Sequence, residues 1–294
     1  MMLRLALLLL WLLSWLPLPV LALLGDALGW AAYHLIAERR RVALTNLALC
    51  FPQFSQTQRQ DLARAHFQAF MTSVLVQGVS WFAPLSRLRR IVQLEQSQRL
   101  SLAVAEGPVI LLTPHFMGVD TVGSFLSADF NLITINSQQK DRRLEALVKG
   151  RRLRWNRGLI FTRQDPIRAV LRALKPGWAL YYLPDQDFGP KDSIFVDFFG
   201  VPTATIPALA GLARLARARG MGCIVRQDYH HGRITVRFEP LWEHFPSGDE
   251  VADTRRMNQF IEQAVLEQPA NYLWTHKRFK TRPPGTASVY SSRD

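Results

Sequence analysis

The longest apolar stretch of the chain lies at its N-terminus. Residues 5–24 read LALLLLWLLSWLPLPVLALL, and no ionisable side chain occurs between Arg4 and Asp26. Twenty helical residues cover about 30 Å, the hydrocarbon thickness of a bilayer. Apolar residues resume after Asp26 and end at a basic run, residues 38–41, which reads ERRR. The pattern predicts an N-terminal membrane anchor over residues 1–37, with the following domain in the cytoplasm because positive charge favours the inner side.

Two features leave the geometry of this anchor open. Pro17 and Pro19 interrupt the helix near its end, since proline removes a backbone hydrogen bond. The segment can therefore cross the bilayer or lie in its interface. A cleaved secretory signal is the alternative, but the apolar core of such a signal covers about 7 to 15 residues, and this one is longer.

Beyond the anchor, the spacing of apolar residues changes. Over residues 38–100 they recur every three or four positions, which predicts a helical leader. After Gly107-Pro108, short apolar runs alternate with amphipathic stretches. The runs predict strands at 109–112, 132–135, 159–161, 178–183, 223–227 and 234–238. The stretches between and after them predict helices at 120–126, 141–155, 166–173, 207–219 and 249–266.

This alternation predicts an α/β fold with a mixed, partly parallel sheet flanked by helices. We expect one domain over residues 38–294, made of the leader, an α/β core at 101–284 and a polar tail at 285–294. Hydrophobic residues make up 48% of the chain, which excludes disorder as a description of the whole. Two cysteines cannot form a disulfide framework.

The chain is strongly basic, with 36 Lys and Arg against 23 Asp and Glu and a formal charge of +13. Much of the excess falls between Lys140 and Arg168, where ten cationic residues face three acidic ones. A solvated face is the ordinary explanation of such a cluster. In a membrane-held chain it also suits a phosphorylated lipid, anionic headgroups or an acidic carrier protein. We interpret it as a docking surface for such partners.

The first candidate for chemistry is His115, which follows the predicted strand at 109–112. Open α/β sheets place their sites beyond the carboxyl ends of their strands. Asp120 is expected in the first turn of the next helix, where it can contact one imidazole nitrogen and leave the other as a general base. No Gly-x-Ser-x-Gly segment supplies a nucleophile, so we expect direct attack by a substrate group. Alone, this spacing fits a structural histidine as well.

Four further segments follow in order along the chain. They are Phe161-Thr162-Arg163, Pro184-Asp185-Gln186-Asp187, a Val201-Pro202 to Ile206-Pro207 segment expected to open a helix, and the closing Trp274-Thr275-His276-Lys277-Arg278-Phe279. With the His-x4-Asp segment, the first three resemble the four blocks of the glycerolipid acyltransferase superfamily, and the closing segment and the N-terminal anchor add to the resemblance. The whole pattern resembles most specifically the late (secondary) lipid A acyltransferases. The resemblance extends from the anchor to about Pro284.

The resemblance implies transfer of a fatty acyl chain from acyl carrier protein to a hydroxyl of a lipid A precursor, at the cytoplasmic face of the inner membrane. It implies that His115 is the base and Asp120 its partner, without a covalent intermediate, a metal or a cofactor. Arg163 stands at the position that binds substrate phosphate, and Asp185 lies in the third block. Arg152 and Arg154 are expected as further substrate contacts.

Two departures from the superfamily pattern concern this first block. Pro114 stands where Asn is frequent before the histidine, and Asp120 stands where many relatives have Glu. The shorter carboxylate leaves the orientation of His115 open.

Other functions are compatible with parts of the sequence. The nearest is acylation of another membrane lipid, such as a lysophospholipid, an ornithine lipid or a glycosyl-inositol lipid. A non-catalytic membrane scaffold is the alternative outside enzymes. Nucleic-acid binding is disfavoured because no recognised reading module occurs. A zinc hydrolase is disfavoured because His230-His231 are adjacent and no His-Glu-x-x-His segment occurs.

Overall fold

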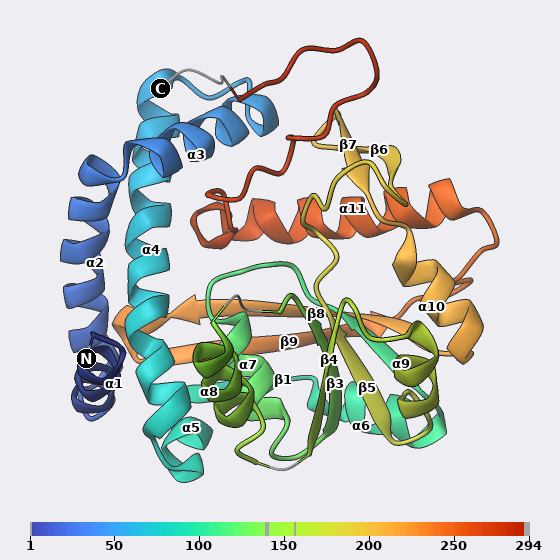
Figure 1. Ribbon diagram of the computed structural model, residues 1–294, viewed down its shortest axis with the longest axis horizontal. Helices are drawn as coiled ribbons and strands as arrows, with labels where there is room; N and C mark the ends of the chain where they lie inside the picture. Colours follow the sequence, from blue (N-terminus) through green and yellow to red (C-terminus); the bar gives the residue numbers. More distant parts are fainter. Residues whose placement is uncertain (1, 139–140, 156, 291–294) are drawn as a thin grey trace.

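The computed structural model describes residues 2–138, 141–155 and 157–290, and Figure 1 shows helices on both sides of a central sheet. The helices are α1 (Met2–Leu13), α2 (Leu18–Leu35), α3 (Ala37–Cys50), α4 (Gln56–Phe82), α5 (Leu85–Ile91), α6 (Ser97–Glu106), α7 (Val119–Leu126), α8 (Arg142–Arg152), α9 (Ile167–Ala173), α10 (Ala208–Ala216) and α11 (Glu250–Glu267), with short 3₁₀ turns η1 (Tyr229–His231) and η2 (Pro269–Asn271). The strands are β1 (Val92–Glu95), β2 (Val109–Leu112), β3 (Asn131–Asn136), β4 (Gly158–Thr162), β5 (Trp178–Tyr182), β6 (Ile194–Phe198), β7 (Val201–Thr205), β8 (Arg219–Asp228) and β9 (Arg233–Leu241).

Seven strands form the main sheet, in the order β1-β9-β8-β2-β5-β3-β4. All neighbours in it are parallel except the β8–β9 hairpin. The predicted α/β fold with a mixed, partly parallel sheet is therefore confirmed. Parallel strands β2, β5, β3 and β4 bring their carboxyl ends to one edge, which is the edge that carries the candidate site.

The sheet is covered on both faces, and its side chains alternate between two cores. Ile110, Leu112 and Leu180 point into a core with α9, α10 and α11. Val109 and Leu111 point into a second core with α4, α6 and α7. Because β2 is buried on both faces, its sequence is a continuous apolar run rather than an alternating one. That run made the strand visible from sequence.

At the N-terminus, Pro17 separates α1 from α2, as the two prolines predicted. Within the described residues, α2 is the one helix long and apolar enough to cross a membrane. It does not stand apart from the domain, because Gly25, Gly29 and Tyr33 on one of its faces are buried against α4. The anchor is thus part of the fold.

Two sequence expectations about secondary structure are wrong. The leader is not wholly helical, because residues 92–95 form the edge strand β1. The segment expected to open a helix at Val201 is β7, paired antiparallel with β6, and the helix begins only at Ala208. Pro202 fits this arrangement, since a two-stranded hairpin tolerates proline at its edges. Pro207 lies after the hairpin, at the residue before α10.

The end of the chain returns to the domain. The Tyr290 hydroxyl accepts a hydrogen bond from the Phe279 backbone at 3.1 Å and donates one to Asn46. Of the predicted polar tail, residues 291–294 lie outside the described residues, as does Lys140 of the basic cluster.

Candidate active site

His115 lies three residues beyond the end of β2, on the loop that leads to α7. Its neighbour is set by the register of the sheet. Leu112, the last residue of β2, is paired with Tyr182, the last residue of β5. Three residues beyond Tyr182 comes Asp185, so the two loops place His115 and Asp185 side by side.

The Asp185 carboxylate holds both the ring and the backbone of His115. One oxygen lies 2.5 Å from Nδ1, and the other accepts the His115 backbone N–H at 2.8 Å. Burial alone would raise the pKa of Asp185, but the charge and hydrogen bonds of His115, with Arg278, bring that pKa below its usual value. An ionised Asp185 accepts the proton of Nδ1, which leaves Nε2 of His115 as the basic nitrogen.

The contact expected between His115 and Asp120 is not formed in the described structure. The Asp120 carboxylate instead accepts hydrogen bonds from Arg152 Nε at 2.5 Å and from Gln77 Nε2 at 2.8 Å. Asp120 does lie in the first turn of α7, as predicted. From there it faces α8 and α4, whereas Asp185 occupies the Nδ1 side of the imidazole. The partner of His115 is therefore Asp185.

The His115 loop is fixed from behind by the C-terminal segment. The Leu273 backbone N–H donates to the His115 carbonyl at 3.1 Å, and the Met117 N–H donates to the Asn271 carbonyl at 2.8 Å. A β-bridge pairs Phe116 with Tyr272. Three consecutive residues of the loop are thus tied to residues 271–273, so the position of the imidazole depends on where the end of α11 lies.

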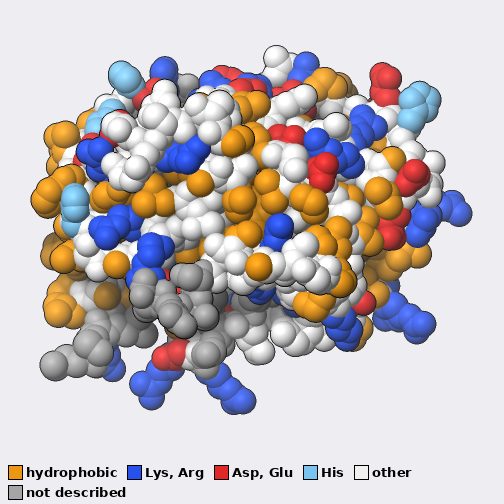
Figure 2. Space-filling view, turned by 90° about the horizontal axis from the view of Figure 1, so that it is seen from above, with side chains coloured by type: hydrophobic (Ala, Val, Ile, Leu, Met, Phe, Trp, Pro, Cys, Tyr) orange, Lys and Arg blue, Asp and Glu red, His pale blue; other side chains and the backbone are white. Residues whose placement is uncertain are grey.

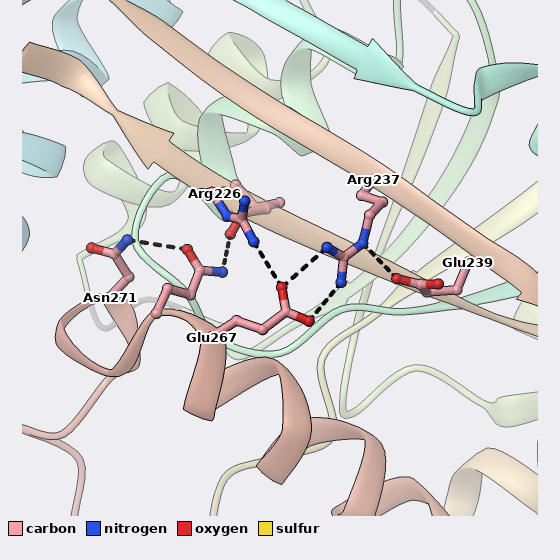
Figure 3. Close-up of polar contacts among 7 residues, drawn as sticks. Arg226, Arg237, Glu239, Glu267 and Asn271 are labelled. Carbon is pink, nitrogen blue, oxygen red and sulfur yellow. Dashed lines mark hydrogen bonds and ion pairs between the residues drawn. The ribbon is translucent and has the colours of Figure 1, made fainter. Parts of the chain in front are cut away.

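Figure 3 shows what holds that end of α11. Glu267 accepts hydrogen bonds from Arg226 at 2.7 Å and from both terminal nitrogens of Arg237 at 2.8 and 3.0 Å. Arg237 also contacts Glu239 at 2.6 Å. Asn271 bonds to the side chain of Gln268 and to that of Gln227 on β8. These contacts join α11 and η2 to the β8–β9 hairpin.

Gly118 allows the turn between the His115 loop and α7. Its φ of 88° lies in the left-handed region, and a Cβ there would stand 3.0 Å from the Tyr229 hydroxyl. Its backbone N–H donates to Ser73 Oγ of α4 at 3.1 Å. A larger side chain at 118 would strain the backbone and press on Tyr229.

A cavity of about 400 Å³ opens beside His115. It runs along the α7 face of the sheet toward the first residues of β3 and β4. Near His115 its lining is mainly polar, and farther along it is mainly apolar or small. The first part includes His115, Asp120, Asn136, Ser137, Arg152, Arg163, Gln186 and Phe188, and the second includes Gly123, Ser124, Ser127, Leu132, Leu153, Gly158, Ile160 and Tyr181. From Leu132 to Asn136 the strand covers about 13 Å. The shape suits a long apolar group whose reacting end lies at His115.

The predicted substrate-binding residues lie in different places. Arg163 lines the cavity, with its guanidinium 3.7 Å from the centre of the Phe188 ring. Arg152 also lines it, held by Asp120. Asp185 is buried behind His115 rather than open to substrate. Arg154 donates to the Ser80 and Ala83 carbonyls at 2.8 Å, so it caps the C-terminal end of α4.

The cations of the basic cluster also differ in their surroundings. Arg151 donates to the Trp81 carbonyl at 3.2 Å and Arg157 to the Asp129 carbonyl at 3.3 Å, which makes them structural. Among the described cations of the cluster, six are exposed: Arg142, Arg143, Lys149, Arg157, Arg163 and Arg168. Only part of the positive charge of the cluster is therefore available to the docking surface that the sequence suggested.

The second acid of the Pro-Asp-Gln-Asp segment is structural. Asp187 is buried and accepts hydrogen bonds from the Thr281 backbone at 2.7 Å, the Thr281 hydroxyl at 2.8 Å and the Gly189 backbone at 2.9 Å. Its own N–H donates to His276 Nε2 at 3.1 Å. Burial, with the charges of His115 and Arg278, lowers the pKa of His276 to about 4. His276 is thus a neutral acceptor.

We expect the stability of the protein to fall between pH 7 and pH 5 because of two histidines. His66, fully buried in α4, also has its pKa lowered to about 4 by burial. The unfolded chain binds these protons near pH 6.5, so between pH 6.5 and 4 it holds more protons than the folded chain, and stability is lost as the pH falls. Between pH 7 and pH 5, each histidine should lower the free energy of unfolding by about 2 kcal/mol. Urea denaturation at the two pH values measures the loss, and His66→Gln should remove about half of it. If His66→Gln lost as much stability as the unchanged protein, the lowered pKa of His66 would be contradicted.

Neither cysteine offers a nucleophile. Burial raises the pKa of Cys223 to about 12 and that of Cys50 further, so both stay as thiols at neutral pH. Within the described part of the chain, no group of three His, Cys, Asp or Glu is placed to hold a metal ion.

Sequence reasoning missed the contributions of α4. Gln77 holds Asp120 and Ser73 holds Gly118, although both belong to the predicted leader. An isolated Gln or Ser in an apolar helix gives no signal of its own. The small cavity residues Ser127 and Gly158 were missed for the same reason.

Comparisons with known proteins cover nearly the whole chain. The family model described as bacterial lipid A biosynthesis acyltransferase matches residues 2–281. Three relatives are from Escherichia coli (strain K12). The lipid A biosynthesis palmitoleoyltransferase is 33% identical over 285 residues, which are 96% of this chain and 92% of the relative. The lauroyltransferase is 31% identical over 288 residues, with 96% and 92% covered, and the myristoyltransferase is 30% identical over 282 residues, with 94% and 84% covered.

Proposed function

Because the chain belongs to the family of bacterial lipid A biosynthesis acyltransferases, we propose that it transfers a fatty acyl chain from acyl carrier protein to a hydroxyl of a phosphorylated lipid A precursor. One observation carries the proposal: the Asp185-bound imidazole of His115 faces a long, mainly apolar cavity. The arrangement supplies a base at the end of a site for an acyl chain.

In the proposed reaction, Nε2 of His115 takes the proton of the acceptor hydroxyl as its oxygen attacks the thioester carbonyl. Asp185 stabilises the resulting imidazolium through Nδ1. The tetrahedral intermediate then collapses, the carbon–sulfur bond breaks, and the imidazolium returns its proton to the leaving thiolate. No acyl-enzyme forms, in keeping with two buried thiols of raised pKa.

Two arginines supply positive charge in this scheme. Arg163, stacked on Phe188 at the cavity rim, binds a phosphate of the acceptor. Arg152 lines the same cavity, and we assign it to the developing oxyanion. Asp120 then acts as a positioning residue, because it fixes the Arg152 guanidinium from the other side.

The donor and the compartment follow from charge and from the N-terminus. Exposed cations of α8 and its surroundings suit an acidic carrier protein at the cavity mouth. The apolar α1 and α2 place the enzyme at a membrane, and we propose the cytoplasmic face of the inner membrane.

We expect the far end of the cavity to select the length of the acyl chain. Gly158 opens β4, and a Cβ there would stand 3.0 Å from the Leu153 Cδ2 atom and 3.8 Å from Ser127 Cβ. Gly158→Val should shorten the cavity and lower kcat/KM for the longest accepted donor by roughly tenfold relative to a donor two carbons shorter. Competition between two acyl carrier proteins of different chain length measures the ratio. Gly150→Val, in open space on α8, is the matched control and should leave the ratio unchanged.

A reconstituted reaction tests the proposed function itself. The purified protein in detergent receives acyl carrier protein loaded with a fatty acid and a phosphorylated glucosamine disaccharide precursor. We expect thioester consumption and a product heavier by one acyl chain. Consumption with a lysophospholipid acceptor and none with the disaccharide would instead favour the other lipid, and no consumption with either would favour a scaffold.

A further inference from the structure

Helices α1 and α2 present an exposed apolar surface. On α2, Leu23, Leu24, Leu28 and Leu35 are exposed, at spacings that share one face of a helix. Leu5 and Leu9 extend the surface along α1. Figure 2 shows hydrophobic side chains gathered along the edge of the molecule that α2 occupies at the left of Figure 1. An apolar surface of this extent marks an interaction site.

The opposite face of α2 is packed so tightly on α4 that the two helices form one unit. A Cβ at Gly25 would come within 2.5 Å of the Thr72 backbone, and one at Gly29 within 2.3 Å of the Gln68 backbone. The Tyr33 ring meets the Phe67 ring edge-on at 5.7 Å. Residue numbers rise along α2 as they fall along α4, so the helices run antiparallel over the length of α2.

Other contacts fix the α1 end of the pair and the middle of α2. On α4, a Cβ at Gly78 would lie 2.4 Å from the Leu10 carbonyl oxygen of α1, so these backbones also touch. Arg87 of α5 donates to the Ser14 and Leu16 carbonyls between α1 and α2. Asp26 meets His230 of η1 at 3.1 Å.

This packing conflicts with a transmembrane path for α2. Its 18 residues would cover about 27 Å, nearly the whole hydrocarbon layer. The antiparallel α4 would have to cross beside it, taking His66, Gln68 and Gln77 into the bilayer at a large cost. Separating the helices would instead expose the close-packed glycine face and the buried Phe67.

We propose that α1 and α2 form an in-plane lipid-binding surface, with the apolar face immersed in one leaflet and both ends of α2 on the side of the catalytic domain. Two features favour a bilayer as the occupant. Trp11, Trp15 and Trp30 are exposed on the surface, as in membrane interfaces. Exposed cations border it at both ends, with Arg4 in the first turn of α1 and Arg39 in the first turn of α3. The proposal rests on the proposed function in one respect: a lipid acceptor reaches the site from the same leaflet.

Vesicle partitioning tests the surface. Leu23 and Leu215 of α10 are each 64% exposed, so Leu23→Lys and Leu215→Lys are a matched pair. On vesicles of phosphatidylethanolamine and phosphatidylglycerol, Leu23→Lys should lower the partition coefficient at least tenfold, because a buried leucine side chain is lost from the lipid. Leu215→Lys should bind as the unchanged protein does. Equal vesicle binding by both variants would overturn the proposal. It would also be overturned if the protein were a dimer that Leu23→Lys dissociates without loss of vesicle binding.

Thiol labelling tests the topology. The two natural cysteines are buried, so the background is low. A cysteine in a short Gly-Ser extension ahead of Met1 is compared with Lys175→Cys on the exposed surface of the catalytic domain. In inverted inner-membrane vesicles, an impermeant maleimide should label both. Labelling of Lys175→Cys alone would show that the N-terminus lies on the other side and overturn the in-plane arrangement.

These measurements are independent of acyl transfer. Leu23→Lys should keep the thioester-consuming activity of the unchanged protein in detergent, where no bilayer is needed. An inactive unchanged protein that still binds vesicles through this face would refute the proposed function and leave the lipid surface standing.

Discussion

His115→Ala should lower kcat for acyl transfer by about three orders of magnitude or more, because it removes the group that deprotonates the acceptor hydroxyl. The fold should survive. The side chain of His115 is 22% exposed, and Asp185 keeps its bond to the backbone N–H at position 115. Single-turnover measurement of product formation on purified protein gives the rate, and circular dichroism and vesicle binding report fold and membrane association.

His115→Asn is the control for lost packing. Its side-chain amide can donate to Asp185, so the buried carboxylate keeps a ring-side partner while the base is absent. Both variants should be equally inactive, with His115→Asn the more stable. A purified His115→Ala enzyme that still transfers at a substantial rate would refute the role of His115 as the base.

Much of the fold could be predicted because the central strands are buried on both faces. β2 and β5 are apolar runs between turn residues, and their predicted and observed limits agree within one residue. β1 was missed because it is a four-residue edge strand with two exposed positions, which reads as polar chain. The β6–β7 hairpin was missed because Pro202, Pro207 and nearby threonines are also typical of a helix start.

The site could be predicted up to the point where it depends on the register of the sheet. His115 and Arg163 follow strands, and position after a strand is visible in sequence. The partner of His115 is not visible in this way, because Asp120 is near in the chain while Asp185 is near only through the pairing of Leu112 with Tyr182. Arg154 was expected to contact the substrate because a sequence does not show which arginines cap a helix end.

Because Asp185 rather than Asp120 lies beside His115, we expect substitutions of Asp185, Asp120 and Asp187 to lower kcat by different amounts. Asp185→Asn should lower kcat by about 10³ to 10⁴, because an amide cannot stabilise the imidazolium and can hold the ring in the wrong tautomer. Asp120→Asn should lower it by only about 10 to 100, since the amide oxygen can still accept from Arg152. If Asp120 were the partner of His115, the order of the two effects would be reversed.

Asp187→Asn separates a catalytic loss from a structural one. Asp187 is buried in the same segment as Asp185, but its bonds go to Thr281 and Gly189 rather than to His115. This variant should unfold at lower urea concentration, since an amide nitrogen replaces one of the accepting oxygens, while kcat of the folded fraction stays within about threefold. Asp185→Asn should show the opposite pattern, with a large loss of kcat and unchanged KM for both substrates, because Asp185 acts on the transition state through His115 and lies behind it. A fall in kcat of similar size in both variants would mean that the whole segment, rather than the Asp185 carboxylate, supports catalysis.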